Sequence, residues 1–330
     1  MLLDGFMRRA EPERPANGTA RRLKLGLALG GGAARGWAHL GVLEVLDREG
    51  IRPDVIAGCS IGAVVGGCWA AGKTEAISTF AHGLTKRRVM GLLDFHIGSG
   101  LIGGHRLRKL LELDLGDLRV ENLPVRFASV ATELVTGHEI WLTQGPLVEA
   151  MRASYALPGV FDPVRVGGRW LMDGALVNPV PVTLARAFGA DIVICVNLNN
   201  DVRLRGTVIQ GVDRSPEDAV PDVAAEGARW PGFFPSFFDG PPRFGAKRGG
   251  GAVAPGLAAV MIDAFNITQD RISRARLERD PPDCVVGPDL ATMGQFEFHR
   301  AAEGIAAGHA ATRAALPRIR AMIQAAAARA

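Results

Sequence analysis

The 330-residue chain has only four cysteines, and their spacing argues against disulfides and metal sites. None forms a C-x-x-C pair, and most lie inside apolar runs, as buried reduced thiols do. The first 22 residues carry scattered charges and no apolar h-region, so they predict a loose basic tail and not a signal peptide. Both features favour a cytoplasmic protein.

The chain also lacks a long basic run with interleaved aromatic residues, although its formal net charge is +4. We therefore expect no nucleic-acid partner. A transmembrane segment is not expected either. Residues 55–72 are 18 residues without a charge, which is about the lower limit for crossing a bilayer. Several glycines make this run only mildly hydrophobic, and its change of character at Gly58 indicates a buried strand that turns into a buried helix.

What the sequence does contain is an alternation of apolar strands and helices. Residues 23–29 predict a strand. A glycine loop comes after it, and then a helix that ends near Gly50. The strand and helix of residues 55–72 come next. This order is the signature of a parallel sheet covered on both faces, so the fold class is α/β. Further strands are indicated at 125–134, 138–143, 163–173 and 190–198, with a helix over 181–189.

Changes in composition and in the pattern of apolar residues divide the chain into four segments. A flexible basic tail (1–22) precedes an α/β core (23–199), and residues 200–256 form a segment rich in Pro, Gly and Phe that predicts a lid or loop. Residues 257–330 predict helices and a short strand packed on the core. In the first of these helices, apolar residues recur at helical spacing, and Pro281 ends it; they are Leu257, Val260, Met261, Ala264 and Ile267.

Aromatic residues concentrate between residues 230 and 248, beside Lys247 and Arg248. They either pin a long loop to the core or form an exposed apolar patch that makes peripheral contact with the inner face of a membrane. The two interpretations stay open.

The glycine loop GGGAARG occupies residues 30–36, between a strand and a helix. Backbone N–H groups at such a helix N-terminus stabilise either a phosphate or a reaction oxyanion. A dinucleotide site would need an acidic residue at the carboxyl end of the second strand. Asp54 instead precedes that strand, and Ser60 stands at its carboxyl end. The oxyanion is therefore favoured, and a nucleotide-binding protein remains an alternative.

Ser60 is the centre of a G-x-S-x-G motif that runs from Gly58 to Gly62. A strained strand-to-helix turn exposes the serine oxygen and tolerates only small neighbours, so Gly58 and Gly62 would form the nucleophile elbow. The helix dipole favours alkoxide character at this position. We interpret Ser60 as a nucleophile.

A nucleophilic serine needs a base. None of the seven histidines follows a strand in the way that a catalytic histidine of an α/β-hydrolase does. Asp173 comes directly after an apolar strand and before Gly174, so its carboxylate could emerge beside Ser60. An ordinary Asp-Gly turn is the alternative.

Taken in order, the motifs GGGAARG, GCSIG and DGA resemble those of the patatin-like phospholipases. The likeness continues through RASYALPGVFDPV and NPVPVTLARAFGADIVICVNL and covers about residues 23–199. The segments DPPDCVVGP and FEFHRAAEGIAAGHAA resemble the bacterial RssA branch in particular. The resemblance implies a single domain with a three-layer α/β/α sandwich and a mainly parallel central sheet.

The resemblance also implies roles for individual residues. Ser60 would be the nucleophile and Asp173 its base, and backbone N–H groups near Gly31, Gly32 and Ala33 would form the oxyanion hole. Ala33 stands where the family's loop has a third glycine. Alanine keeps the N–H group but would be strained at a positive φ.

Arg35 would position this loop or contact an anionic head group. The implied activity is hydrolysis of a lipid acyl ester, as in a phospholipase, a lysophospholipase or a related esterase, with no metal or organic cofactor. A catalytically weak regulator or scaffold with the same fold is the other alternative.

Overall fold

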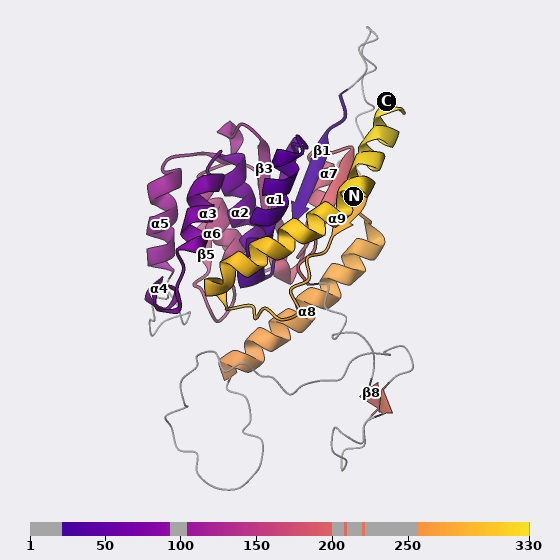
Figure 1. The fold of residues 1–330 in the computed structure, drawn as a ribbon. Coiled ribbons are helices and arrows are strands. Elements are labelled where there is room, and N and C mark those ends of the chain that lie inside the picture. The colour runs from indigo at the N-terminus through magenta and orange to yellow at the C-terminus, as the bar shows by residue number, and fades with distance from the viewer. Residues whose placement is uncertain (1–21, 93–103, 200–207, 210–219, 222–256, 330) are drawn as a thin grey trace, which may run out of the picture.

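The computed structural model describes residues 22–92, 104–199, 208–209, 220–221 and 257–329 (Figure 1). The expected basic tail, all but its last residue, lies outside the described residues. So do the aromatic residues of 230–248 and most of the segment 200–256, so the predictions made for them stay predictions.

A mostly parallel sheet forms the centre of the described chain. Its strand order is β10-β7-β1-β2-β3-β6-β5, and β4 pairs with β3. Strands β10, β7, β1, β2 and β3 are parallel to one another, whereas β4, β5 and β6 are antiparallel additions. The strands are β1 (Leu25–Leu29), β2 (Val55–Cys59), β3 (Arg126–Glu133), β4 (Glu139–Leu142), β5 (Val164–Val166), β6 (Arg169–Asp173), β7 (Ile192–Val196) and β10 (Cys284–Val286). Two short strands, β8 (Val208–Ile209) and β9 (Val220–Pro221), pair apart from this sheet.

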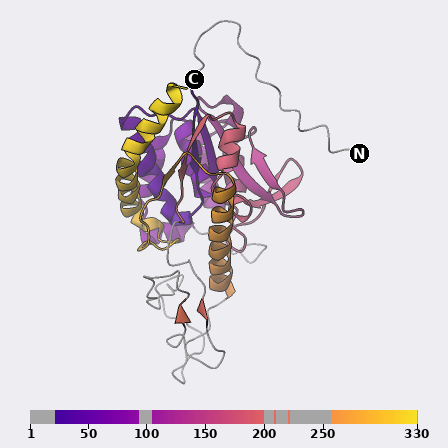
Figure 2. The ribbon, with the colours of Figure 1, turned by 90° about the vertical axis from the view of Figure 1, so that its right-hand side faces the viewer.

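Helices cover both faces of the sheet (Figures 1 and 2). The longer ones are α1 (Ala38–Arg48), α2 (Ile61–Ala70), α3 (Thr74–His82), α4 (Lys86–Leu92), α5 (His105–Leu115), α6 (Leu147–Tyr155), α7 (Val182–Ala187), α8 (Leu257–Arg279) and α9 (Ala301–Ala327). Short 3-10 helices are η1 (Ala33–Trp37), η2 (Val120–Asn122), η3 (Gly174–Leu176) and η6 (Phe298–Arg300).

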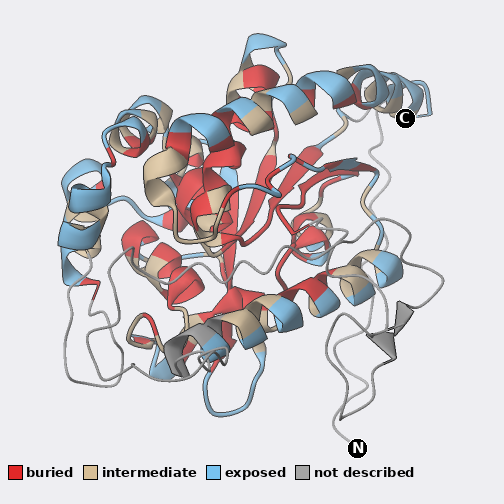
Figure 3. Ribbon diagram, turned by 60° about the horizontal axis from the view of Figure 1, so that its bottom comes forward, coloured by how far each residue is buried: buried red, intermediate tan, exposed pale blue. Residues whose placement is uncertain are grey.

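The central strands alternate large and small side chains between the two faces. Leu27 and Leu29 of β1 pack in one buried cluster with α1, α2 and α9, whereas Ala28 joins a second cluster with α7. Period-two alternation of this kind separates the two faces of a strand. Figure 3 shows the buried strands between helices whose outer surfaces are exposed. The expected three-layer α/β/α fold with a mainly parallel sheet in one domain is confirmed.

Two predictions about apolar segments are also confirmed. Residues 55–72 form the buried strand β2 and the largely buried helix α2. The four cysteines are free and buried. Within the described part of the chain, no helix combines the length and the hydrophobicity that crossing a membrane requires.

Helix α8 differs from its expected orientation. The helix ends at Arg279, before Pro281, as predicted, but its apolar side chains do not form the buried face. Val260, Met261 and Ile267 are 46%, 44% and 53% exposed. Among the α8 side chains whose burial the structure describes, the buried ones are instead polar: Gln269, Asp270 and Ser273. The periodicity of apolar residues predicted the helix correctly. Which face of the helix is buried depends on tertiary contacts, which the periodicity does not show.

Helices α1 and α9 pack closely because each has a glycine, which has no side chain, at the point of contact. A Cβ atom on Gly41 of α1 would lie 2.1 Å from the carbonyl oxygen of Ile305, and a Cβ on Gly308 of α9 would lie 2.0 Å from that of Ala38. A methyl group fits at neither position. This close contact holds α9 against α1.

We expect Gly308→Ala to lower the free energy of unfolding by about 1–3 kcal/mol, the usual cost of overpacking. The added methyl group would have to separate α9 from the α1 backbone. Thermal unfolding measures the effect, and Gly91→Ala in α4 is the control, since a Cβ there meets no atom within 4 Å. Equal melting temperatures for the two variants would contradict this packing argument.

Candidate active site

The register of β3 brings two distant strand ends together. Val130 pairs with Cys59 of β2 and with Trp141 of β4, so β2 and β4 lie on opposite sides of β3. Ala131 pairs with Ile140 of β4 and with Asp173 of β6. Strand β6 therefore lies on the same side of β3 as β2. The two strands meet end to end, and Ser60, which follows β2, comes to face Asp173, the last residue of β6.

Ser60 and Asp173 are hydrogen bonded to each other. The Ser60 hydroxyl donates to Asp173 Oδ2 over 2.7 Å, and the Ala175 N–H donates to Oδ1 over 2.8 Å. Asp173 is only 2% exposed, so the carboxylate is held almost entirely by protein atoms. The structure thus brings together the two residues that the sequence singled out as nucleophile and base.

The backbone at Ser60 is strained. Its φ is 54° and its ψ is −124°, a combination that non-glycine residues rarely adopt. The neighbouring glycines leave no room for side chains: a Cβ on Gly58 would lie 2.5 Å from the Cα of Ala63, and one on Gly62 would lie 2.2 Å from the carbonyl oxygen of Leu29. This is the geometry that a nucleophile elbow requires.

The C-terminal end of α6 holds both members of the pair. Ser154 Oγ accepts a hydrogen bond from the Ser60 N–H over 2.9 Å, and the carbonyl oxygen of Ala156 accepts one from the Asp173 N–H over 2.9 Å. Sequence reasoning gave these residues no role. They lie in the segment RASYALPG, which carried part of the family likeness but contains no motif that states its function.

Burial sets the electrostatics of Asp173. Desolvation raises the pKa of its carboxyl group to about 7, although the hydrogen bonds from the Ala175 N–H and the Ser60 hydroxyl act in the opposite direction. A carboxylate with a pKa near neutrality is a better proton acceptor than an ordinary aspartate.

The glycine loop presents two backbone donors beside this pair. The N–H groups of Gly32 and Ala33 make no hydrogen bond to another described residue, and both residues line the same cavity as Ser60. The prediction that Gly31 is a third donor is wrong in this structure, because its N–H donates to the carbonyl oxygen of Pro179 over 2.9 Å. Gly31 nevertheless lies beside Ser60, since a Cβ built on it would be 3.4 Å from the Ser60 Cβ.

Two further side chains fix the loop from behind. His39 is fully buried, and its Nε2 donates to the carbonyl oxygen of Gly30 over 2.8 Å. Burial lowers the pKa of His39 to about 4, so the ring stays neutral. Arg35 Nε donates to the carbonyl oxygen of Met293 over 2.9 Å. This contact favours the loop-positioning role for Arg35 over contact with a head group.

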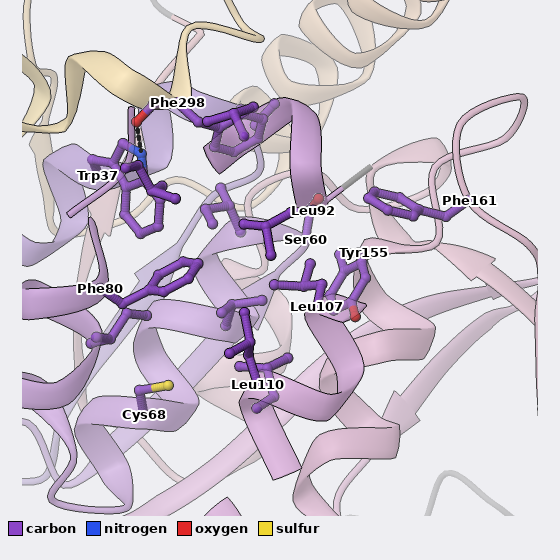
Figure 4. A pocket seen from close by; sticks show the side chains of 18 of the residues that line it. Trp37, Ser60, Cys68, Phe80, Leu92, Leu107, Leu110, Tyr155, Phe161 and Phe298 are labelled. Atoms are coloured by element: carbon purple, nitrogen blue, oxygen red, sulfur yellow. Dashed lines mark hydrogen bonds between the residues drawn. The ribbon is translucent and has the colours of Figure 1, made fainter. Parts of the chain in front are cut away.

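A cavity of about 820 Å³ extends from the Ser60–Asp173 pair. Helix α2 lines it with Ile61, Val64 and Cys68, which recur every three or four residues along one face. Figure 4 shows Ser60 near Leu107 and Tyr155, with Phe80 across the cavity and Cys68 farther from Ser60. Burial raises the pKa of the Cys68 thiol to about 12, so this side chain stays neutral in an apolar wall.

The fold and the site together define an α/β protein with a serine–carboxylate pair in the wall of an apolar cavity. Comparison with known proteins agrees: the model of the family described as patatin-like phospholipase matches residues 27–186. An uncharacterized NTE family protein of Mycobacterium tuberculosis is 34% identical, over 89% of this chain and 91% of its own length. The chain belongs to the patatin-like phospholipase family, as the sequence motifs predicted.

Other relatives share a smaller part of their length. A second uncharacterized NTE family protein of Mycobacterium tuberculosis is 30% identical over 90% of this chain and 48% of its own length. The protein named lysophospholipase nte1 of Emericella nidulans is 30% identical over 55% of this chain and 12% of its own length. The likeness to the RssA branch stays a prediction.

Ala33 has a φ of 49°, so the position where the family's loop carries glycine does require a left-handed backbone. Alanine is strained there by about 1–2 kcal/mol, and glycine loses about 0.5–1 kcal/mol more conformational freedom on folding. We expect Ala33→Gly to raise the free energy of unfolding by up to about 1 kcal/mol.

Urea unfolding measures this change. The neighbouring Ala34→Gly, where φ is not positive and the methyl group is buried, is the control and should lower stability. The interpretation fails if both variants are destabilised alike.

The raised pKa of Asp173 makes stability depend on pH. Between about pH 4 and pH 7 the folded protein binds a proton at Asp173 that the unfolded chain does not bind, so this group's contribution to stability falls as pH rises through that range. Asp173→Asn removes the titration. We expect this variant to be more stable than the native protein by about 1–3 kcal/mol at pH 8, with the advantage fading at pH 5.

Urea unfolding at the two pH values tests this expectation. Ser60→Ala keeps the carboxylate and should keep the pH dependence of the native protein. A stability difference between Asp173→Asn and the native protein that is equal at pH 5 and pH 8 would show that Asp173 does not titrate in this range.

Proposed function

We propose that the protein is a serine acyl hydrolase that cleaves lipid esters. The observation that carries this proposal is the 2.7 Å hydrogen bond from the Ser60 hydroxyl to a buried Asp173, both of which line a cavity of about 820 Å³. Family membership supports lipid hydrolysis, and one relative bears the name lysophospholipase.

In this mechanism Ser60 Oγ attacks the ester carbonyl carbon while its proton moves to Asp173. The electron pair of the carbonyl π bond moves onto the oxygen, which the N–H groups of Gly32 and Ala33 stabilise. Collapse of this tetrahedral intermediate breaks the bond to the leaving alkoxide, which takes the proton from Asp173. Water, activated by Asp173, then attacks the acyl-enzyme and releases the fatty acid.

The cavity supports an acyl chain as the group bound beside Ser60. From Ile61 to Cys68, its wall follows eight residues of helix α2, and the seven steps between them correspond to about 10 Å. Leucine and aromatic side chains of α3 and α5 complete that wall. Each methylene of an acyl chain that leaves water for such a surface contributes about 0.8 kcal/mol. A polar substrate of the same size would gain nothing comparable.

We expect Ser60→Ala and Asp173→Asn each to abolish hydrolysis of a p-nitrophenyl acyl ester while the protein stays folded. In the native protein, kcat/KM should rise with pH and level off above about pH 7, because only ionised Asp173 accepts the serine proton. Spectrophotometric assay of released nitrophenol measures both effects.

Labelling with a fluorophosphonate, followed by mapping of the modified residue, is the matched test of the site. The label is expected on Ser60 and absent from Ser60→Ala. Turnover near the native rate in either variant would refute the Ser–Asp mechanism. A native protein that takes up no label would favour a regulator or scaffold with this fold.

A further inference from the structure

Helix α8 crosses the catalytic end of the sheet and contributes to the active-site cavity. It runs diagonally below the other elements in Figure 1 and packs against η3, the turn that follows Asp173. Phe265 and Gln269, which are one helical turn apart on α8, line the same cavity as Ser60 and Asp173. The cavity wall therefore includes a polar side chain from a part of the chain far from both motifs.

The side-chain amide of Gln269 lies over the glycine loop. A Cβ atom built on Gly31 would be 2.8 Å from Gln269 Nε2, 3.4 Å from the Ser60 Cβ and 3.5 Å from the Ala175 Cβ. Gln269 Nε2 and the Ser60 Cβ thus both lie close to the same position beside Gly31. Gly31 is next to Gly32, so the amide is also close to the backbone donors of the loop.

This amide is buried without a hydrogen-bond partner. Gln269 is 2% exposed, and Nε2 has no partner among the described residues. A glutamine amide carries two N–H donors, and leaving them unpaired away from water destabilises the folded state. An unpaired buried donor beside a nucleophile is suited to an acceptor that is present only during the reaction.

An ion pair and apolar contacts together hold α8 near the site, with Leu277 packed against the buried cluster on the α7 face of the sheet. On the same face of α8 as Gln269, Asp270 pairs with Arg274 over 2.6 Å. Arg276 pairs with Glu139 of β4 over 2.7 Å and so ties α8 to the sheet. The apolar residues Val260, Met261 and Ile267 are exposed. The buried face of the described part of α8 that turns toward the site is therefore polar at Gln269, Asp270 and Ser273.

We propose that the Gln269 amide donates a hydrogen bond to the oxyanion of the tetrahedral intermediate on Ser60, alongside the N–H groups of Gly32 and Ala33. The proposal rests on the acyl hydrolysis proposed above. When the bond from Ser60 Oγ to the carbonyl carbon forms, the π electron pair passes to the carbonyl oxygen and the serine proton passes to Asp173. The oxygen is then a full anion, and a charged acceptor makes a stronger hydrogen bond with an amide than the neutral carbonyl of the ester does.

The test is Gln269→Met, which keeps approximately the volume of the side chain and removes the donor. We expect kcat for a p-nitrophenyl acyl ester to fall by about 10²- to 10³-fold, the usual loss for one oxyanion donor, with KM nearly unchanged. The inhibition constant of an alkyl trifluoromethyl ketone, which forms a tetrahedral adduct with serine, should rise in parallel with the loss in kcat/KM.

The matched control is Ser273→Ala. Ser273 lies one turn along the same buried face of α8, is 1% exposed, and its Oγ also has no partner within the described chain. It does not line the cavity. We expect native kcat and native inhibition in this variant, so a general loosening of α8 is separated from the loss of the donor.

The outcomes distinguish this proposal from the proposed function. Turnover in Ser60→Ala refutes the proposed function, whatever Gln269 does. An inactive Ser60→Ala together with native kcat in Gln269→Met, or with a change in KM alone, overturns the role of Gln269. If Gln269→Met does not fold, the isosteric variant Gln269→Glu is tested at pH 8 in its place. Its carboxylate replaces the amide donor by an acceptor, so we expect at least the same loss in kcat.

Discussion

The hydrogen bond between the Ser60 hydroxyl and the Asp173 carboxylate is the interaction on which the arrangement of the site depends. It exists because β3 is long enough to pair with β2 along its first part and with β6 along its last part, on the same side. Strands β2 and β6 run in opposite directions, so their carboxyl ends meet. The end of α6 then fixes the backbone on both sides of the junction. A parallel β6 would not present its carboxyl end to that of β2 in this way.

This arrangement contains several features that destabilise the folded state. Ser60 and Ala33 have positive φ values, a carboxyl group that ionises near pH 7 is buried, and the Gln269 amide has no partner among the described residues. All four positions line one cavity. Strain and unpaired polar groups that persist at one place require a rigid surrounding structure. Here the buried apolar clusters, one on each face of the sheet, provide this rigid surrounding structure.

The sequence predicted the parts of the site that depend on local order along the chain. Ser60 was identified because G-x-S-x-G lies between a strand and a helix, and Asp173 because it ends a strand before a glycine. The partners of these residues depend on strand register and on long-range packing, which a single sequence does not report. The bond from Gly31 to Pro179, the contact from Ser154 to Ser60 and the inward polar face of α8 are of this second kind. Apolar periodicity even indicated the opposite face of α8.

The C-terminal part of the chain completes the site and is not an appendage to it. The family match ends at residue 186, yet Phe265, Gln269 and Phe298 line the cavity with Ser60. Arg35, at the end of the glycine loop, is held by the carbonyl oxygen of Met293. Ser60, Asp173 and the backbone N–H groups of Gly32 and Ala33 thus come from the matched region, whereas part of the cavity wall comes from beyond it. Because Phe265, Gln269 and Phe298 line the cavity, the substrate preference of the proposed lipid hydrolase should depend on these C-terminal elements as well as on the Ser–Asp pair.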